Sequence, residues 1–135
     1  MRNEKLKESY SEALKNKQQM YKEGIEKFIS LECKDEANLE KIKLNIYSIF
    51  SSVFDISYKK VYGGKNEFNE ESYNKLYEVY MEFFDKIPSN WKENYAKAEK
   101  HGFTTECIIE EIKLTTANEI KDMFIKHYNE QKIIG

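Results

Sequence analysis

The chain has 135 residues, 40% of them hydrophobic and 34% charged, with one proline, five glycines and a formal net charge of −2. This length fits a single domain with its own core, and the composition argues against a disordered or an all-β chain. The charge divides into +3 over residues 1–66 and −5 over residues 67–135, which argues against nucleic acid as the main partner.

The first predicted helix covers residues 3–31. Its apolar residues fall on roughly one side: Leu6, Tyr10, Leu14, Tyr21, Ile25 and Phe28. The first half of this helix is dense in Lys and Glu, and each large side chain gains only about 1.5–3 kcal/mol from full burial. Two arrangements are therefore possible for this helix. Either the helix lies on its own bundle as an outer helix, or residues 3–22 pair with a second copy in a homodimer.

The second predicted helix, residues 39–62, is expected to be central. Two apolar sets follow helical spacing along it: Leu39, Ile42, Ile46, Ile49, Val53 and Ile56, and Tyr47, Phe50, Phe54, Tyr58 and Val61. Together the two sets cover more than half of the circumference, which predicts neighbouring helices on two sides. Ile49 and Val53 lie midway along the widest apolar arc, so we expect both at the centre of the core.

Short local signals should fix the ends of this helix. Asp35 or Asn38 can cap its start by accepting hydrogen bonds from free N–H groups. Gly63 and Gly64 can close it, because glycine adopts the left-handed conformation cheaply. Residues 63–71 then form the longest predicted loop, in which the Phe68 side chain is expected to pack on the core.

A third helix is predicted from residue 70 to residue 87. Pro88 should stop it, because the residue before a proline is pushed out of the helical region. Asn90 and Glu93 resemble a capping box, which would begin a short helix over residues 91–101.

A last helix is expected from Thr104 or Thr105 to about Tyr128, after a glycine turn. No strand-like alternation of useful length accompanies these helical patterns. The predicted fold class is therefore all-α. Residues 1–135 should form a single-domain antiparallel bundle of four to five helices around the central helix 39–62.

The polar residues form no catalytic constellation. His101 and His127 lack the glutamate three residues earlier that a di-iron bundle requires. Cys107 lies near a helix start, which favours a thiolate, but the adjacent Glu106 opposes one. We expect Cys33 and Cys107 to be free thiols. The sequence predicts no catalytic residue, no metal and no cofactor, and the chain is not expected to be an enzyme.

Two short segments resemble nucleic-acid contacts, and both have a simpler interpretation. Residues 98–108 resemble part of a helix-turn-helix. We expect Glu110 and Glu111 to face solvent. They make the helix that would enter the DNA groove negatively charged, which opposes contact with phosphates. A helix–glycine–helix corner at Gly102 is therefore favoured. Residues 58–65 interleave lysines with tyrosines, as single-strand binders do, but lysines that end a helix are commoner.

Aromatic residues make up 14% of the chain, and this excess is the main indication of function. Tyr and Trp are enriched at binding hot spots, although many tyrosines in a bundle simply fill the core with the hydroxyl at its rim. The residues predicted to contact a partner are Tyr10, Tyr58, Tyr62, Tyr73, Tyr77 and Trp91.

The chain is therefore predicted to be a non-catalytic protein-interaction module, such as a small regulator, inhibitor or immunity-type protein. We expect it to be cytoplasmic, without a signal peptide or membrane span. The alternatives are a small-ligand-binding bundle with a tyrosine-lined pocket, or a weak nucleic-acid binder. The excess of Lys, Asn, Ile and Tyr, which have AT-rich codons, points to a low-GC bacterium or a mobile element.

Overall fold

The computed structural model describes residues 2–64 and 68–134. Four helices make up this part of the chain, namely α1 (Arg2–Ser30), α2 (Lys34–Tyr62), α3 (Glu70–His101) and α4 (Thr104–Ile134). The all-α prediction is confirmed, and no strand occurs among the described residues. Within the same ranges, no helix has the length and apolar character needed to cross a membrane.

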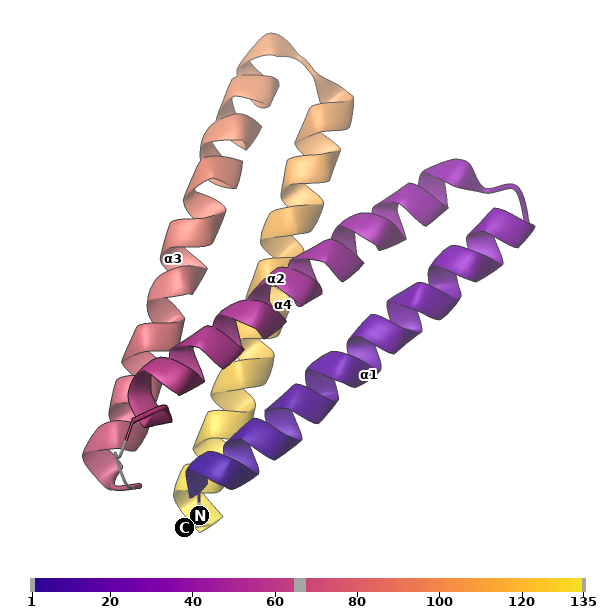
Figure 1. Ribbon diagram of the computed structural model, residues 1–135. Coiled ribbons are helices and arrows are strands. Elements are labelled where there is room, and N and C mark those ends of the chain that lie inside the picture. Colours follow the sequence, from indigo (N-terminus) through magenta and orange to yellow (C-terminus); the bar gives the residue numbers. More distant parts are fainter. Residues whose placement is uncertain (1, 65–67, 135) are drawn as a thin grey trace.

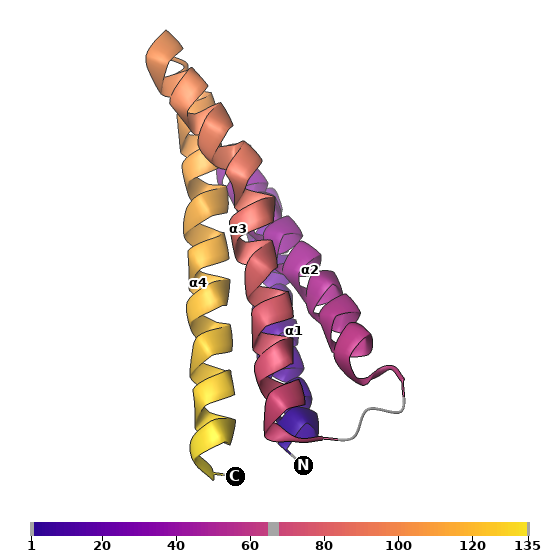
Figure 2. The same ribbon diagram turned by 90° about the vertical axis from the view of Figure 1, so that its left-hand side faces the viewer.

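The helices form two hairpins that cross at an angle. Figure 1 shows α1 paired with α2 and α3 paired with α4, with the two hairpin tips pointing in different directions. The start of α1 and the end of α4 lie at the opposite end of the molecule (Figure 2). α2 and α4 each contact the other three helices, so the crossing region is where all four helices meet.

One aromatic ring from each helix lies at this crossing. Tyr10 of α1, Phe54 of α2, Tyr80 of α3 and Phe124 of α4 are all 0% exposed. Each ring contacts the other three, with centroids 4.7 to 6.0 Å apart and mostly edge-to-face geometry. This geometry places the positive edge of one ring against the negative face of another. We name these four residues the aromatic tetrad.

The tetrad decides which face of α2 is buried, and that face differs from the predicted one. Ile49 and Val53 are only partly buried, and Ile56 is 58% exposed. The buried residues of α2 are Ala37, Ile46, Tyr47, Phe50, Phe54, Ser57 and Val61. The prediction that Ile49 and Val53 occupy the centre of the core is therefore wrong, because the rings of the second apolar set find ring partners on the other helices.

The apolar stripe of α1 is buried within this chain. Leu6, Tyr10, Leu14 and Tyr21 are at most 7% exposed, and α1 contacts both α2 and α4. Of the two alternatives for residues 3–22, this packing matches the outer helix on its own bundle. A homodimer would have to use other residues of α1, and it stays a prediction.

α3 continues through Pro88, where the sequence predicts a helix end. Pro88 lies inside α3 and is buried, although proline offers no N–H to the Phe84 carbonyl and costs about 3 kcal/mol in a helix interior. Phe84 and Ala98, on either side of it, are also buried. Packing of one continuous helix offsets the local cost, so the stop at Pro88 and the capping box at Asn90 and Glu93 are wrong.

The true capping box lies at the start of α3. Asn69 Oδ1 accepts a hydrogen bond from the Ser72 N–H at 2.7 Å, and Ser72 Oγ accepts one from the Asn69 N–H at 3.1 Å. Serine replaces the Glu or Gln usual at this third helical position, which hides the signal in the sequence. Phe68 packs against the core beside this cap, as expected.

The other predicted helix ends have mixed outcomes. α2 begins at Lys34 without a side-chain cap, so the caps predicted at Asp35 and Asn38 are wrong. Gly63 follows α2 in a right-handed conformation, with φ −72°, instead of the left-handed one. Gly102 closes α3 with φ +70°, and α3 and α4 then run side by side (Figure 1). This corner belongs to a helical hairpin, unlike the steep crossing of a helix-turn-helix.

Truncating Phe54 to Ala should cost about 3–5 kcal/mol of unfolding free energy, because it empties the centre of the tetrad. Ile49→Ala should cost only about 1–2 kcal/mol, because its side chain is partly buried and loses less apolar burial. Urea unfolding of both variants measures the difference. An equal loss in the two variants would contradict the placement of the core.

Candidate functional site

Two of the residues predicted to contact a partner lie in the core. Tyr10 is 0% and Tyr73 is 1% exposed. The Tyr10 hydroxyl oxygen lies 2.7 Å from that of Tyr80, which lies 3.2 Å from the carbonyl oxygen of Phe50. Tyr73 donates to the carbonyl oxygen of Tyr128 at 2.8 Å. Tyr10 and Tyr73 therefore do not form a contact surface, because internal partners satisfy their hydroxyls.

The other predicted contact residues are partly exposed: Tyr58, Tyr62, Tyr77 and Trp91. Tyr58 and Tyr62 are neighbours on α2, with ring centroids 4.9 Å apart. Asn3 donates to the Tyr58 hydroxyl at 3.1 Å, and Ser72 donates to the Tyr62 hydroxyl at 3.2 Å. The other two pack on the core from α3 and stand about four helical turns apart. The structure thus brings one pair together, and partner contact by these residues stays a prediction.

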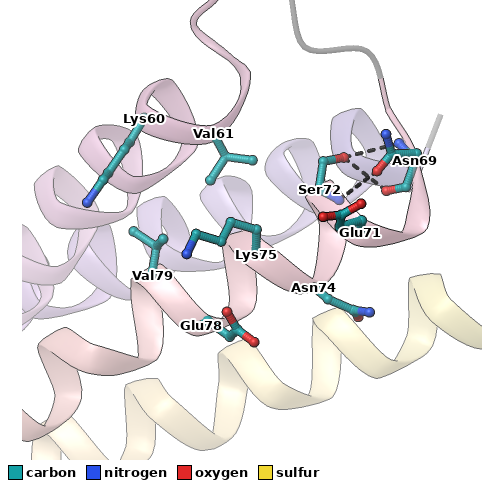
Figure 3. A pocket seen from close by; sticks show the side chains of 9 residues that line it. All are labelled: Lys60, Val61, Asn69, Glu71, Ser72, Asn74, Lys75, Glu78 and Val79. Carbon is teal, nitrogen blue, oxygen red and sulfur yellow. Dashed lines mark hydrogen bonds between the residues drawn. The ribbon is translucent and has the colours of Figure 1, made fainter.

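A groove of about 830 Å³ lies between the end of α2 and the start of α3 (Figure 3). Its lining consists of Lys60, Val61, Asn69, Glu71, Ser72, Asn74, Lys75, Glu78 and Val79. Lysines and glutamates are equal in number in this lining, so the groove does not concentrate the positive potential that attracts phosphate. Lys65 of the predicted basic segment lies outside the described residues.

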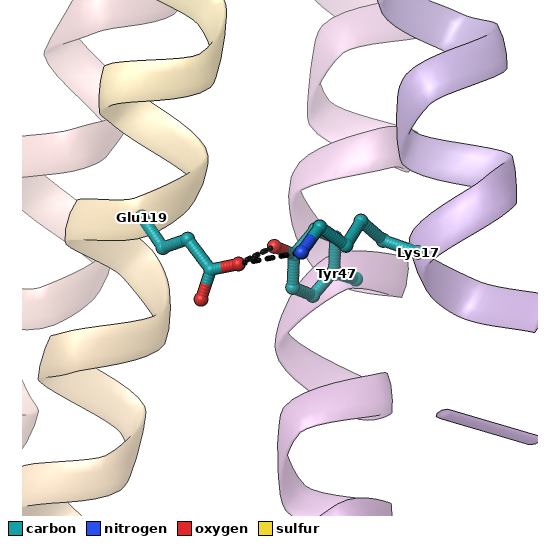
Figure 4. Close-up of polar contacts among 3 residues, drawn as sticks. All are labelled: Lys17, Tyr47 and Glu119. Atoms are coloured by element: carbon teal, nitrogen blue, oxygen red, sulfur yellow. Dashed lines mark hydrogen bonds and ion pairs between the residues drawn. The ribbon is translucent and has the colours of Figure 1, made fainter. Parts of the chain in front are cut away.

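A polar contact joins three helices beside the crossing (Figure 4). Glu119 Oε1 of α4 accepts a hydrogen bond from the Tyr47 hydroxyl of α2 at 2.8 Å and lies 3.2 Å from Lys17 Nζ of α1. Burial, and then the Glu119 carboxylate, raise the pKa of Tyr47, so this hydroxyl remains a donor at neutral pH. The Lys17 and Glu119 side chains are 38% and 44% exposed, and an ion pair so open to water adds little stability.

A hollow of about 310 Å³ separates the two hairpins next to this contact. It is lined by Tyr21, Lys43, Glu111, Ile112, Thr115, Thr116 and Glu119. Tyr21 is the one tyrosine named in this lining and is 7% exposed, so this hollow is not the tyrosine-lined pocket of the alternative prediction.

A third hollow, also about 310 Å³, lies between α3 and α4 close to their tip, and we name it the tip hollow. It is lined by Asn94, Lys97, Ala98, His101, Phe103, Glu106 and Glu110. Glu110 is only 9% exposed, so the prediction that it faces solvent is wrong, whereas Glu111 is exposed as predicted. The Lys113 ammonium, 3.3 Å from Glu110 Oε1, makes the burial tolerable because a paired charge is cheaper to bury.

The two cysteines are free and partly exposed. Desolvation raises the pKa of Cys107, and the charges of Glu99 and Glu106 raise it further. The start of α4 therefore does not produce a thiolate at this position, in agreement with the effect expected of Glu106. Throughout residues 2–64 and 68–134, no three His, Cys, Asp or Glu side chains gather in an arrangement that could hold a metal ion.

Large apolar side chains are exposed chiefly at the hairpin tips. Among the described residues, the exposed ones are Met20, Ile29, Leu31, Ile56, Phe103 and Ile108. Ile29 and Leu31, 55% and 59% exposed, lie at the α1–α2 tip, and Phe103 and Ile108, 55% and 46% exposed, lie at the α3–α4 tip. The sequence carried no signal for this surface, because an apolar residue in or beside a helix has the same identity whether its side chain is buried or exposed.

The chain matches no protein-family model, no curated protein and no solved structure.

Tyr80→Phe should destabilise the fold more than Tyr10→Phe. A carbonyl oxygen only accepts, so Tyr80 donates to Phe50 and Tyr10 donates to Tyr80. Tyr80→Phe leaves the buried Tyr10 hydroxyl without an acceptor and should lower the free energy of unfolding by about 1–3 kcal/mol. Tyr10→Phe removes one hydrogen bond and should lower it by about 0.5–1.5 kcal/mol.

The double variant provides the control for this pair. With both hydroxyls absent, no buried donor is stranded, so it should be more stable than Tyr80→Phe alone. Urea unfolding of the three variants measures these differences. A larger loss in Tyr10→Phe than in Tyr80→Phe would contradict this assignment of donors and acceptors.

Alkaline pH should unfold the protein cooperatively. Burial raises the pKa of Tyr128 to about 12 and also raises the pKa values of Tyr10, Tyr47 and Tyr80. The folded chain therefore keeps protons that the unfolded chain releases from about pH 10 upward. Stability is complete below that pH and falls as the pH rises through the folded-state pKa values.

Denaturant unfolding at a series of alkaline pH values, combined with ultraviolet titration of tyrosinate, measures this effect. Most tyrosinate absorbance should appear together with the loss of helical circular dichroism. Complete titration of the tyrosines while the helices persist would contradict the described burial.

Proposed function

We propose that this chain is a non-catalytic module that binds another protein, in the manner of a small regulator, inhibitor or immunity-type protein. The observation that carries the proposal is the exposure of Ile29 and Leu31 at one hairpin tip and of Phe103 and Ile108 at the other. Scattered exposed apolar residues are ordinary, but paired ones at the projecting ends of a molecule are accessible to a partner surface.

The distribution of the core supports the same proposal. The tetrad and most buried residues lie at the crossing of the hairpins, whereas Ala37, Ala98 and Glu110 are among the few buried residues close to the tips. Each tip is therefore held mainly by its own two helices, and its apolar side chains have little of the chain's own core to pack against. Binding a partner would bury them at about 25 cal/mol per Å² of apolar surface.

A small-ligand binder is the second candidate, and the groove of Figure 3 favours it. Its volume of about 830 Å³ lies within the usual range for ligand pockets. Among the described residues of its lining, Val61 and Val79 are apolar, the others are polar or charged, and none is a tyrosine. A ligand there would therefore carry polar groups instead of stacking on phenol rings. Weak nucleic-acid binding stays an untested third alternative.

Some finer predictions, about the arrangement of the helices, the location and the assembly, are proposals as well. We propose that residues 39–62 form the centre of an antiparallel bundle, and the support is that α2 contacts each of the other helices, a property it shares with α4. A cytoplasmic location, and a homodimer through the N-terminal helix, likewise stay predictions.

Site-specific photo-crosslinking in cells of the native host tests the proposed function. A photoreactive residue at position 31 or 103 should join the chain to the same partner protein. Position 56 is the matched control, because Ile56 is 58% exposed and Leu31 is 59% exposed, while Ile56 lies on α2 away from both tips.

Lysine substitutions then test whether the apolar tips hold the partner. Leu31→Lys and Phe103→Lys should each weaken capture about tenfold or more, as expected when a hot-spot contact worth over about 1.4 kcal/mol is lost. Ile56→Lys should leave capture unchanged. Equal crosslinking at all three positions, or none at either tip, would refute the assignment of the tips as the binding surface.

A further inference from the structure

Glu110, which lines the tip hollow, has a buried carboxylate oxygen without a donor among the described residues. Glu110 is 9% exposed, and its Oε1 pairs with Lys113 at 3.3 Å. Its Oε2 is buried and has no hydrogen-bond partner among the described residues. A buried acceptor left in this state costs about 1–3 kcal/mol, and more when it is charged. A group that donated a hydrogen bond to this oxygen would recover that free energy.

The hollow is open to solvent on the side away from Glu110. Ala98 and Glu110 are the buried members of its lining, whereas Lys97, Phe103 and Glu106 are exposed. The buried members therefore form the inner wall and the exposed members the rim. A volume of about 310 Å³ offers room for one large side chain, at the small end of the range for ligand pockets.

We propose that the tip hollow receives an arginine side chain of the partner protein. This inference rests on the proposed function and adds the chemistry by which the α3–α4 tip recognises its partner. The guanidinium enters beside the exposed Phe103 and donates to Glu110 Oε2, with Glu106 as a second carboxylate at the entrance.

Two features favour a guanidinium over an ammonium. Glu106 and Glu110 are four residues apart on α4 and so share one face of the helix, and the five N–H donors of arginine can serve two carboxylates at once. Phe103 is 55% exposed and stacks on His101 with centroids 5.7 Å apart and an interplanar angle of 29°. Arginine stacks on such aromatic faces, which a compact, strongly hydrated ammonium does less well.

The remaining charges around the hollow set the direction of entry. Lys97 stands on the α3 side, and Lys113 already neutralises part of the Glu110 charge. The guanidinium therefore approaches along the α4 side, past Glu106. Glu110 Oε2 is buried in the structure, so a guanidinium reaches it only when side chains around the hollow move aside. Lys97 and Glu106 are exposed charged residues of this lining.

A titration with a small arginine probe tests this proposal on the isolated full-length chain. The probe is Nα-acetyl-arginine N-methylamide, and its uncharged isostere, the citrulline analogue, is the control. Backbone amide resonances of residues 94–111 should shift saturably with the arginine probe. The citrulline analogue should bind at least about tenfold more weakly, because it lacks the charge-assisted hydrogen bonds to a carboxylate.

Matched variants locate the probe. Glu110→Gln should weaken arginine binding about tenfold or more, whereas Glu111→Gln should leave it unchanged, because Glu111 is exposed and lies outside the tip hollow. The comparison of arginine with citrulline uses the unmodified protein, so it decides the matter even where Glu110→Gln fails to fold.

The outcomes separate this inference from the proposed function. Absence of saturable shifts, equal binding of both probes, or arginine binding unaffected by Glu110→Gln would overturn the arginine site and leave water as the group that satisfies Glu110. Crosslinking of a partner at positions 31 and 103 would still stand in that case. Arginine binding without any crosslinked partner would instead refute the proposed function while retaining the site.

Discussion

The contact among the four rings of the aromatic tetrad is the constraint on which the rest of the structure depends. Each ring comes from a different helix and touches the other three, so moving any helix breaks three contacts together. Two of the rings are tyrosines, and their hydroxyls form a chain that ends on the Phe50 carbonyl oxygen. The tetrad is thus an apolar cluster whose polar atoms have partners inside the core, which fixes both the position and the rotation of α1 and α3.

Because the core lies at the crossing, the hairpin tips have few buried residues to pack against. The rings of the aromatic tetrad are buried in the interior, whereas residues at the tips, such as Leu31 and Phe103, are exposed. The Glu119 contact with Tyr47 and Lys17 (Figure 4) links the hairpins beside the core and does not reach the tips. Shape, exposed apolar surface and a buried acceptor therefore coincide at the α3–α4 tip, and this coincidence makes it the best-supported surface for a partner.

The sequence was a good guide to which segments are helical and a poor one to how they face each other. The periodicity of residues 39–62 predicts a helix, but an apolar arc that wide has no single preferred direction. The sequence therefore predicts Ile49 at the centre of the core, a position that Phe54 occupies in the structure. Pro88 and Glu110 also show that a single sequence does not reveal how the helices pack. Both break a local rule, and both are tolerated because of neighbours brought by tertiary packing, which single-sequence patterns do not contain.

The tyrosines show why an excess of one residue type is weak evidence for a binding surface. The hydroxyls of Tyr10, Tyr73 and Tyr80 form hydrogen bonds with partners inside the core, and their rings pack against other core residues. Composition counts these residues equally with Tyr58 and Tyr62, which remain partly exposed. A tyrosine is informative about binding only when its ring is exposed and its hydroxyl lacks an internal partner. The exposed apolar side chains of the tips, together with Glu110, are therefore stronger evidence for a binding surface than the aromatic content of the sequence.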